Sequence, residues 1–96
     1  MTSIEEQRYY WLNRFGSDDH PEEALLSKLQ TGDPSERIRA VISFARKDTV
    51  SELSMLEVAR HLSDDGKVDL GANYEPVRWV PTVRACCEVF LPLIVS

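Results

Sequence analysis

D-P-S-E-R-I-R-A-V-I-S-F-A-R, residues 33–46, carries the clearest helix-start signal in the chain. Asp33 has the chemistry of an N-cap, Pro34 suits the first helical position, and Glu36 has the spacing of a capping box. The stretch therefore predicts the start of a helix. Apolar residues that recur at helical spacing form its expected inner face, namely Ile38, Val41, Ile42 and Ala45. The basic residues expected mostly on its outer face are Arg37, Arg39, Arg46 and Lys47.

Upstream of this stretch the sequence predicts two more helices. Ser3 and Glu6 have capping-box spacing and Gly16 is a stop signal, which indicates a helix over residues 4–15. Its expected buried side consists of Ile4, Trp11, Leu12 and Phe15. Acidic residues around Pro21 predict a second helix that runs to about Thr31 before Gly32, and its expected apolar stripe is Leu25, Leu26 and Leu29.

Downstream, Thr49 and Glu52 again have capping-box spacing and predict a helix to Ser63. Its expected inner residues are Leu53, Leu56, Ala59 and Leu62. Residues 63–76 contain two glycines and end on a proline, so they are expected to form a long loop. A last helix is expected to begin near Val80 or Pro81. Its expected stripe is Val80, Val83, Cys87, Phe90, Leu91 and Ile94.

These signals predict an all-α protein of about five helices, arranged as stacked antiparallel helix pairs in a short α-solenoid or an irregular bundle. A chain of 96 residues is long enough to bury one core, so residues 1–96 are expected to form a single helical domain. The hydrophobic content of 43% and the charged content of 28% are typical of globular proteins.

The charge of the chain bears on its partners. Sixteen acidic against eleven basic residues give a net charge of −5, which repels phosphate backbones and attracts basic proteins. Direct nucleic-acid binding is therefore not expected. The acidic start, M-T-S-I-E-E-Q, lacks the pattern of an export signal, so a cytoplasmic location is expected. The uncharged run 89–96 is too short for a membrane span.

The residues that could carry chemistry do not form a recognisable site. Cys86 and Cys87 are adjacent on a predicted helix, where successive side chains are turned by about 100°, so a disulfide between them would be strained. Cys87 is expected in the core and Cys86 beside it. His20 and His61 are isolated from further ligands, and Asp64, Asp65 and Asp69 do not follow the spacing of a calcium loop. No metal, cofactor or catalytic residue is predicted.

Two segments resemble each other. I-R-A-V-I-S-F-A-R begins at Ile38 and V-R-A-C-C-E-V-F-L begins at Val83, 45 positions later. Over residues 33–93 the chain resembles short HEAT-repeat proteins, whose helix pairs recur at about 40–47 residues. The sequence departs from that pattern at Ile42 and Cys87, where alanine is usual, and at Arg46, where leucine is usual. The final unit also lacks a second helix. The resemblance implies a scaffold that binds protein partners and has no chemistry of its own.

The sequence therefore favours a protein-binding module, most simply a small acidic immunity-type inhibitor that neutralises a basic toxin or another basic protein. The alternatives are an adaptor, a phage-type inhibitor that covers a nucleic-acid-binding surface, and a small enzyme without a recognisable motif. Exposed aromatic residues and nearby acids are the expected partner-binding residues. They are Tyr9, Tyr10, Asp64, Asp65, Asp69, Tyr74, Glu75 and Trp79.

The C-terminal segment L-P-L-I-V-S is apolar, so its side chains are expected to be shielded from water. It is expected to be buried in this domain, covered by a partner, or paired with a second copy of the chain. A homodimer through this segment is one of these three options.

Overall fold

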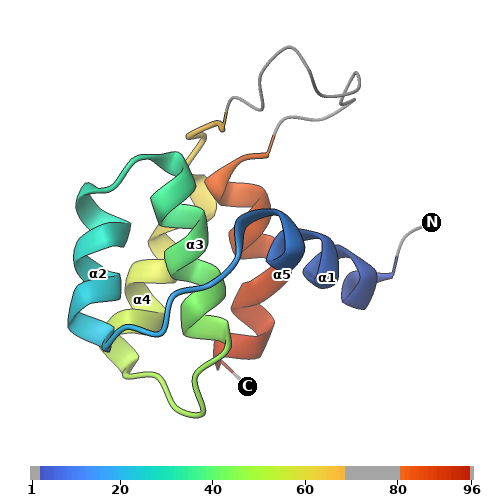
Figure 1. Ribbon diagram of the computed structural model, residues 1–96. Helices are drawn as coiled ribbons and strands as arrows, with labels where there is room; N and C mark the ends of the chain where they lie inside the picture. The colour runs from blue at the N-terminus through green and yellow to red at the C-terminus, as the bar shows by residue number, and fades with distance from the viewer. Residues whose placement is uncertain (1–2, 69–80, 96) are drawn as a thin grey trace.

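The computed structural model describes residues 3–68 and 81–95, and these residues form five α-helices and one short 3₁₀ helix (Figure 1). The elements are α1 (Ile4–Phe15), α2 (Glu22–Thr31), α3 (Pro34–Ala45), α4 (Glu52–Arg60), η1 (His61–Ser63) and α5 (Val83–Val95). The predicted all-α class with five helices packed against each other is confirmed. In the described part of the chain, no helix is both long enough and apolar enough to cross a membrane.

The first helix begins and ends, and the third helix begins, where the local signals predict. Ser3 Oγ accepts a hydrogen bond of 3.2 Å from the Glu6 N–H at the start of α1. Gly16, with φ of 75°, ends α1 in the left-handed region that glycine adopts at low cost. At the start of α3, Asp33 accepts from the Glu36 N–H at 2.8 Å, and the Glu36 carboxylate accepts from the Asp33 N–H at 3.4 Å. The capping box predicted there is confirmed.

The predicted cap of α4 is wrong: the cap is Ser51 and not Thr49. Ser51 Oγ accepts a hydrogen bond of 3.3 Å from the Ser54 N–H. Glu22 of α2 accepts one bond from the Ser51 N–H and another from Ser54 Oγ, both at 3.0 Å. A glutamate from another helix therefore satisfies the N–H that a capping-box glutamate would satisfy locally. These bonds hold the starts of α2 and α4 together.

The last helix begins at Val83, slightly later than predicted, because Thr82 caps it: Thr82 Oγ1 accepts from the Ala85 N–H at 3.0 Å. An isolated antiparallel bridge between Lys67 and Thr82 brings the two sides of the predicted loop together at its base. The Val68 N–H also donates to the Pro81 carbonyl at 3.0 Å. Residues 69–80, which include most of that predicted loop and Val80, lie outside the described residues.

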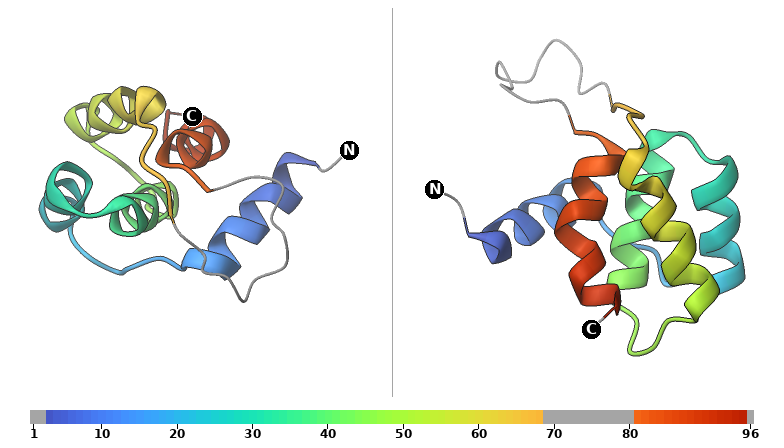
Figure 2. Two further views of the ribbon diagram at one scale, coloured as in Figure 1. Left: turned by 90° about the horizontal axis from the view of Figure 1, so that it is seen from above. Right: turned by 180° about the vertical axis from the view of Figure 1, so that it is seen from behind.

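The four helices from α2 to α5 form two antiparallel hairpins, α2 with α3 and α4 with α5 (Figure 1). The hairpins stack so that α2 packs against α4 and α3 packs against α5. Helices α2 and α4 therefore run in one direction, and α3 and α5 run in the other. Helix α1 lies outside this four-helix stack and packs against α3 and α5 (Figure 2).

The core lies between these helices, and most of the residues predicted to be buried are buried. They are Trp11, Phe15, Leu25, Leu29, Ile38, Val41, Ile42, Val83, Cys87, Phe90 and Ile94. Another four pack against the core while partly exposed, namely Leu12, Leu26, Ala45 and Leu91. The Trp11 and Phe15 rings stack with their centroids 5.4 Å apart, which fixes the C-terminal half of α1 on the stack.

The predicted inner face of α4 is wrong. Leu53 is 75% exposed and Leu56 is 56% exposed, whereas Ser54 and Val58 are buried. The Ser54 hydroxyl can be buried because Glu22 accepts its hydrogen bond, so this face of α4 can turn inward. Two other predicted core residues, Ile4 and Leu62, are also exposed.

Two further expectations about individual side chains are corrected. Cys86 does not flank the core but is as fully buried as Cys87, and its Sγ lies 3.8 Å from the Ile38 carbonyl oxygen. Arg37 and Arg39 are half-buried and not on an outer face, because each has a partner within the fold. Arg39 Nε donates to the Phe15 carbonyl at 3.1 Å, and Arg37 donates to Asp64.

Candidate functional site

The two predicted aromatic contact residues of α1 both reach the surface, but they border different grooves. Tyr9 is 67% exposed and Tyr10 is 37% exposed. Adjacent residues on a helix are turned by about 100°, so the two rings leave α1 in different directions. Tyr10 lies on the side where α1 meets α5, and Tyr9 lies toward α3 and the end of α5.

The groove between α1 and α5 has a volume of about 430 Å³ and is called here the α1–α5 groove. It is lined by Glu6, Gln7, Tyr10, Trp11, Ala85, Glu88 and Val89. The residues of α1 that line the groove are spaced four apart, Glu6 with Tyr10 and Gln7 with Trp11. Ala85 and Val89 of α5 have the same spacing. Residues four apart lie on one face of a helix, so each helix presents one face to the groove. Arg8 Nε donates to the Val89 carbonyl at 3.1 Å and ties the two walls together.

The α1–α5 groove is acidic at its edges and apolar on its walls. Glu6 and Glu88 are both exposed and come from different helices. Trp11, Ala85 and Val89 provide apolar surface between them. Glu88 also accepts a hydrogen bond of 3.2 Å from Arg84, but both side chains are 57% exposed, so this ion pair is weak and can be exchanged for another. Such a groove suits the long side chain of a lysine or arginine.

The groove beside Tyr9 is more apolar. It has a volume of about 380 Å³ and lies between α1, α3 and the end of α5. Leu12, Ile42, Phe90 and Leu93 contribute its apolar surface. Part of the C-terminal apolar segment therefore faces this groove, while Ile94 is buried in the core.

The other predicted contact residues, which follow α4 in the chain, divide into three groups. Asp65 is exposed, as a contact residue should be. The Asp64 side chain is only 12% exposed and forms an ion pair with Arg37 of α3. The remaining four lie outside the described residues, namely Asp69, Tyr74, Glu75 and Trp79. The structure therefore does not bring the predicted contact residues of α1 and of the loop together in one described surface, and their role in binding stays a prediction.

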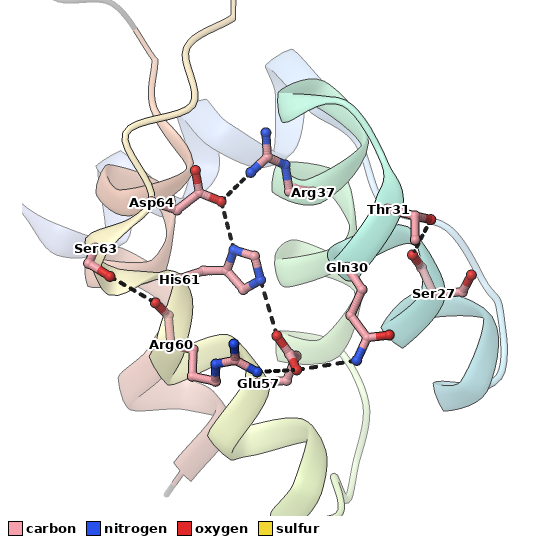
Figure 3. Close-up of polar contacts among 9 residues, drawn as sticks. All are labelled: Ser27, Gln30, Thr31, Arg37, Glu57, Arg60, His61, Ser63 and Asp64. Atoms are coloured by element: carbon pink, nitrogen blue, oxygen red, sulfur yellow. Dashed lines mark hydrogen bonds and ion pairs between the residues drawn. The ribbon is translucent and has the colours of Figure 1, made fainter.

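Asp64 is the centre of a polar cluster that the sequence did not predict (Figure 3). Its Oδ2 accepts a hydrogen bond from Arg37 of α3 and lies 2.7 Å from His61 Nδ1, and its Oδ1 accepts from the Gly66 N–H at 2.9 Å. Burial acts to raise the pKa of Asp64. The hydrogen bonds from His61 and Gly66, with the charge of Arg37, outweigh burial and hold the pKa below its usual range.

The cluster continues from His61 to α4 and α2. His61 Nε2 lies 3.3 Å from Glu57 Oε2, so the imidazole sits between two carboxylates. Glu57 Oε1 in turn accepts from Gln30 of α2 at 3.3 Å and from Arg60 at 3.4 Å (Figure 3). Glu57 and His61 are four positions apart, and His61 and Asp64 are three apart. This helical spacing could have predicted from the sequence that the three side chains share a face. The contact of Arg37 with Asp64 could not be predicted in this way, because the two residues are 27 positions apart.

The two cysteines are in surroundings that suppress thiol reactivity. Both are free and buried. Burial raises the pKa of Cys86 well above its usual value and that of Cys87 to about 12, where the nearby charges of Asp64 and Glu88 add to the effect. The thiolate is the reactive form, so both side chains behave as packing groups. Among residues 3–68 and 81–95 there is also no group of three or more histidine, cysteine or acidic side chains that could hold a metal ion.

No family model matches the chain, and no curated protein or solved structure is significantly similar to it.

Proposed function

We propose that the chain is a non-catalytic binding module that uses the α1–α5 groove to hold a basic protein, as a small cytoplasmic immunity-type inhibitor of a basic toxin would. The observation that carries the proposal is the pair of exposed carboxylates, Glu6 and Glu88, on opposite walls of a groove with an aromatic edge. A net charge of −5 favours encounter with a partner of opposite charge.

The groove is suited to one inserted lysine or arginine side chain. The methylene groups would lie against the apolar surface of Trp11, Ala85 and Val89, and the cationic group would lie between Glu6 and Glu88. The exposed ring of Tyr10 at the edge of the groove would add a cation–π contact.

We also propose that the two hairpins are a short HEAT-like array that acts as the scaffold for this groove. Helices α3 and α5 carry the two similar segments and pack side by side in the same direction (Figure 1). The segments start at Ile38 and Val83, which are 45 positions apart. In this arrangement α3 and α5 are the second helices of their hairpins. The final unit, α4 with α5, then has both of its helices.

The test compares three baits in affinity capture from the source cells. The baits are the wild-type chain, the double variant Glu6→Gln/Glu88→Gln, and the control Glu23→Gln/Asp48→Asn. The control makes the same change in net charge at two exposed residues outside the groove. We expect the wild type and the control to retain a stoichiometric basic protein that the groove variant loses. Direct titration of that protein should show about 10- to 100-fold weaker binding for the groove variant.

Two results would count against this function. Equal capture by all three baits would show that the groove is not the contact surface. Equal losses with the groove variant and the control would show that only net charge matters. If the captured protein binds nucleic acid, and its nucleic acid competes with the chain, the inhibitor would be one that covers a nucleic-acid-binding surface.

A further inference from the structure

The outer face of α4 carries a stripe of four residues that the fold leaves exposed. The stripe, called here the α4 stripe, consists of Glu52, Leu53, Leu56 and Arg60. At about 100° per residue these four positions span only about 100° of the helix circumference, so they share one face. Leu53 and Leu56 are 75% and 56% exposed, and the Arg60 side chain is 77% exposed. Two neighbouring exposed leucines on one helix face form a small apolar patch that another surface can cover.

The position of α4 in the stack explains why this face is uncovered. Helix α4 belongs to the second hairpin, and its inner side packs against α2 and α5. Seen from behind, α4 lies at the surface between its two neighbours, and no described helix covers it (Figure 2). Stacked helical hairpins bury their apolar faces against the next unit, so the end of a stack presents a face that another unit can cover.

The stripe has a negative charge at one end and a positive charge at the other, so two copies that pair antiparallel bring opposite charges together. Glu52 lies four residues before Leu56, and Arg60 lies four residues after it. Along the helix axis the two charged positions are therefore about 12 Å apart, with Leu56 midway between them. If a second α4 packs antiparallel across Leu56, Glu52 of each copy lies opposite Arg60 of the other. Leu53 of each copy then lies opposite the half-buried Ala59.

We propose that the α4 stripe is a self-association surface on which two copies of this chain pair about a two-fold axis that passes beside Leu56. A two-fold interface requires one surface to match itself, and opposite charges placed symmetrically about a leucine meet that requirement. A different protein would need no such symmetry in its target. None of the four stripe residues lines the α1–α5 groove, so the dimer and the proposed basic partner use separate surfaces.

The dimer should be weak. One helix of nine residues is about 13 Å long and offers far less area than the roughly 800 Å² per partner of a standard stable interface. The ion pair that Arg60 makes with Glu57 at 3.4 Å is exposed and costs little to rearrange. We therefore expect dissociation at about 10–100 µM.

The first experiment measures molar mass against concentration by light scattering or sedimentation equilibrium. The wild type should rise from 11.0 kDa toward twice that mass as its concentration increases from about 1 µM to about 0.5 mM. The variant Leu53→Gln/Leu56→Gln should stay monomeric with an unchanged circular dichroism spectrum, because both side chains are exposed. The control Leu93→Gln replaces another exposed leucine, on the groove beside Tyr9, and should still dimerise.

The second experiment uses the symmetry of the charges. Glu52→Arg alone puts like charges opposite each other at both ends of the interface, and so does Arg60→Glu alone. Each variant should be monomeric by itself. An equimolar mixture of the two should form a heterodimer, because every opposed pair is again of opposite sign. A variant that simply failed to fold could not regain association on mixing, so this result separates pairing from stability.

Three outcomes would overturn the proposal. The first is a wild type that stays monomeric up to about 0.5 mM. The second is dimerisation that Leu93→Gln abolishes and Leu53→Gln/Leu56→Gln does not, which would place the interface at the C-terminal segment. The third is a mixture of the two charge variants that remains monomeric although both are folded.

Discussion

Among single residues, Asp64 was predicted to contact a partner, but it connects three parts of the fold. Its carboxylate holds Arg37 of α3 and His61 of η1. Its backbone carbonyl accepts from the Arg84 N–H of α5 at 2.9 Å. One residue therefore connects the third helix, the end of the fourth and the start of the last. An acid that composition alone would place in a solvated loop is part of the structure's interior.

Replacing Asp64 with asparagine should destabilise the fold. The change leaves the Arg37 guanidinium half-buried without its charged partner, and Arg37 Nε already has no hydrogen-bond acceptor. We expect a loss of about 2 kcal/mol in the free energy of unfolding. Urea denaturation followed by circular dichroism measures it. The control Asp65→Asn changes the exposed neighbour and should stay within about 0.5 kcal/mol of the wild type. Equal effects of the two variants would contradict the structural role.

The pH dependence of this loss follows from the lowered pKa of Asp64. A carboxyl group whose folded-state pKa is depressed contributes stability above its ordinary value, here 3.8, and that contribution disappears as pH falls through the lower folded-state pKa. The stability difference between wild type and Asp64→Asn should therefore be constant from pH 7 to near pH 4.5 and shrink below pH 3.8. Urea denaturation at a series of pH values checks it. A difference that stays unchanged below pH 3.8 would contradict this origin of the loss.

What the sequence could reveal at this scale was limited by distance along the chain. The exposure of at least one of Tyr9 and Tyr10 was predictable, because adjacent large residues on one helix cannot share a buried face. The groove beside Tyr10 was not, since its second carboxylate, Glu88, comes from a helix at the other end of the chain. Arg37 and Asp64 are likewise 27 positions apart. No local spacing indicates such pairs.

At the scale of elements, the start of α4 gives a direct test of the corrected cap. Replacing Ser51 with alanine removes the acceptor for the Ser54 N–H and should cost about 1 kcal/mol of stability. Replacing Thr49 with alanine should cost less than about 0.3 kcal/mol, because the helix begins after it. Thermal or urea denaturation of the two variants side by side decides between the caps. A larger loss with Thr49→Ala would restore the cap that the sequence favoured.

The same helix shows where prediction from sequence ends. Caps and stops are local, so the limits of α1 and the start of α3 followed from neighbouring residues alone. The face of α4 did not, because the helix has two competing apolar sets. Leu53 and Leu56 form one, and Met55 and Val58 form the other. The second set faces inward together with Ser54, and it can do so only because Glu22 of α2 satisfies the serine hydroxyl.

At the scale of the whole molecule, stability is concentrated where the two hairpins meet. Helices α3 and α5 supply most of the fully buried side chains, and both cysteines lie on the buried side of α5. The first two turns of α1 bury little, since residues 3–7 are all exposed. Opening of α1 alone should therefore be possible without separating the hairpins. Exposure of Cys86, whose Sγ lies against Ile38 of α3, should require that separation.

Thiol labelling should accordingly report global unfolding. Burial raises the pKa of both cysteines, to about 12 for Cys87, and removes them from contact with reagent, so the native protein should react far more slowly than the urea-unfolded chain. The protection factor is the labelling rate of the unfolded chain divided by that of the native protein. When the opened protein closes faster than the reagent reacts with it, this factor gives the free energy of opening. It should equal the free energy of unfolding from urea denaturation and fall by the same amount in Asp64→Asn. Rapid labelling under native conditions, or a much smaller opening energy, would mean that α5 separates from α3 without unfolding of the rest.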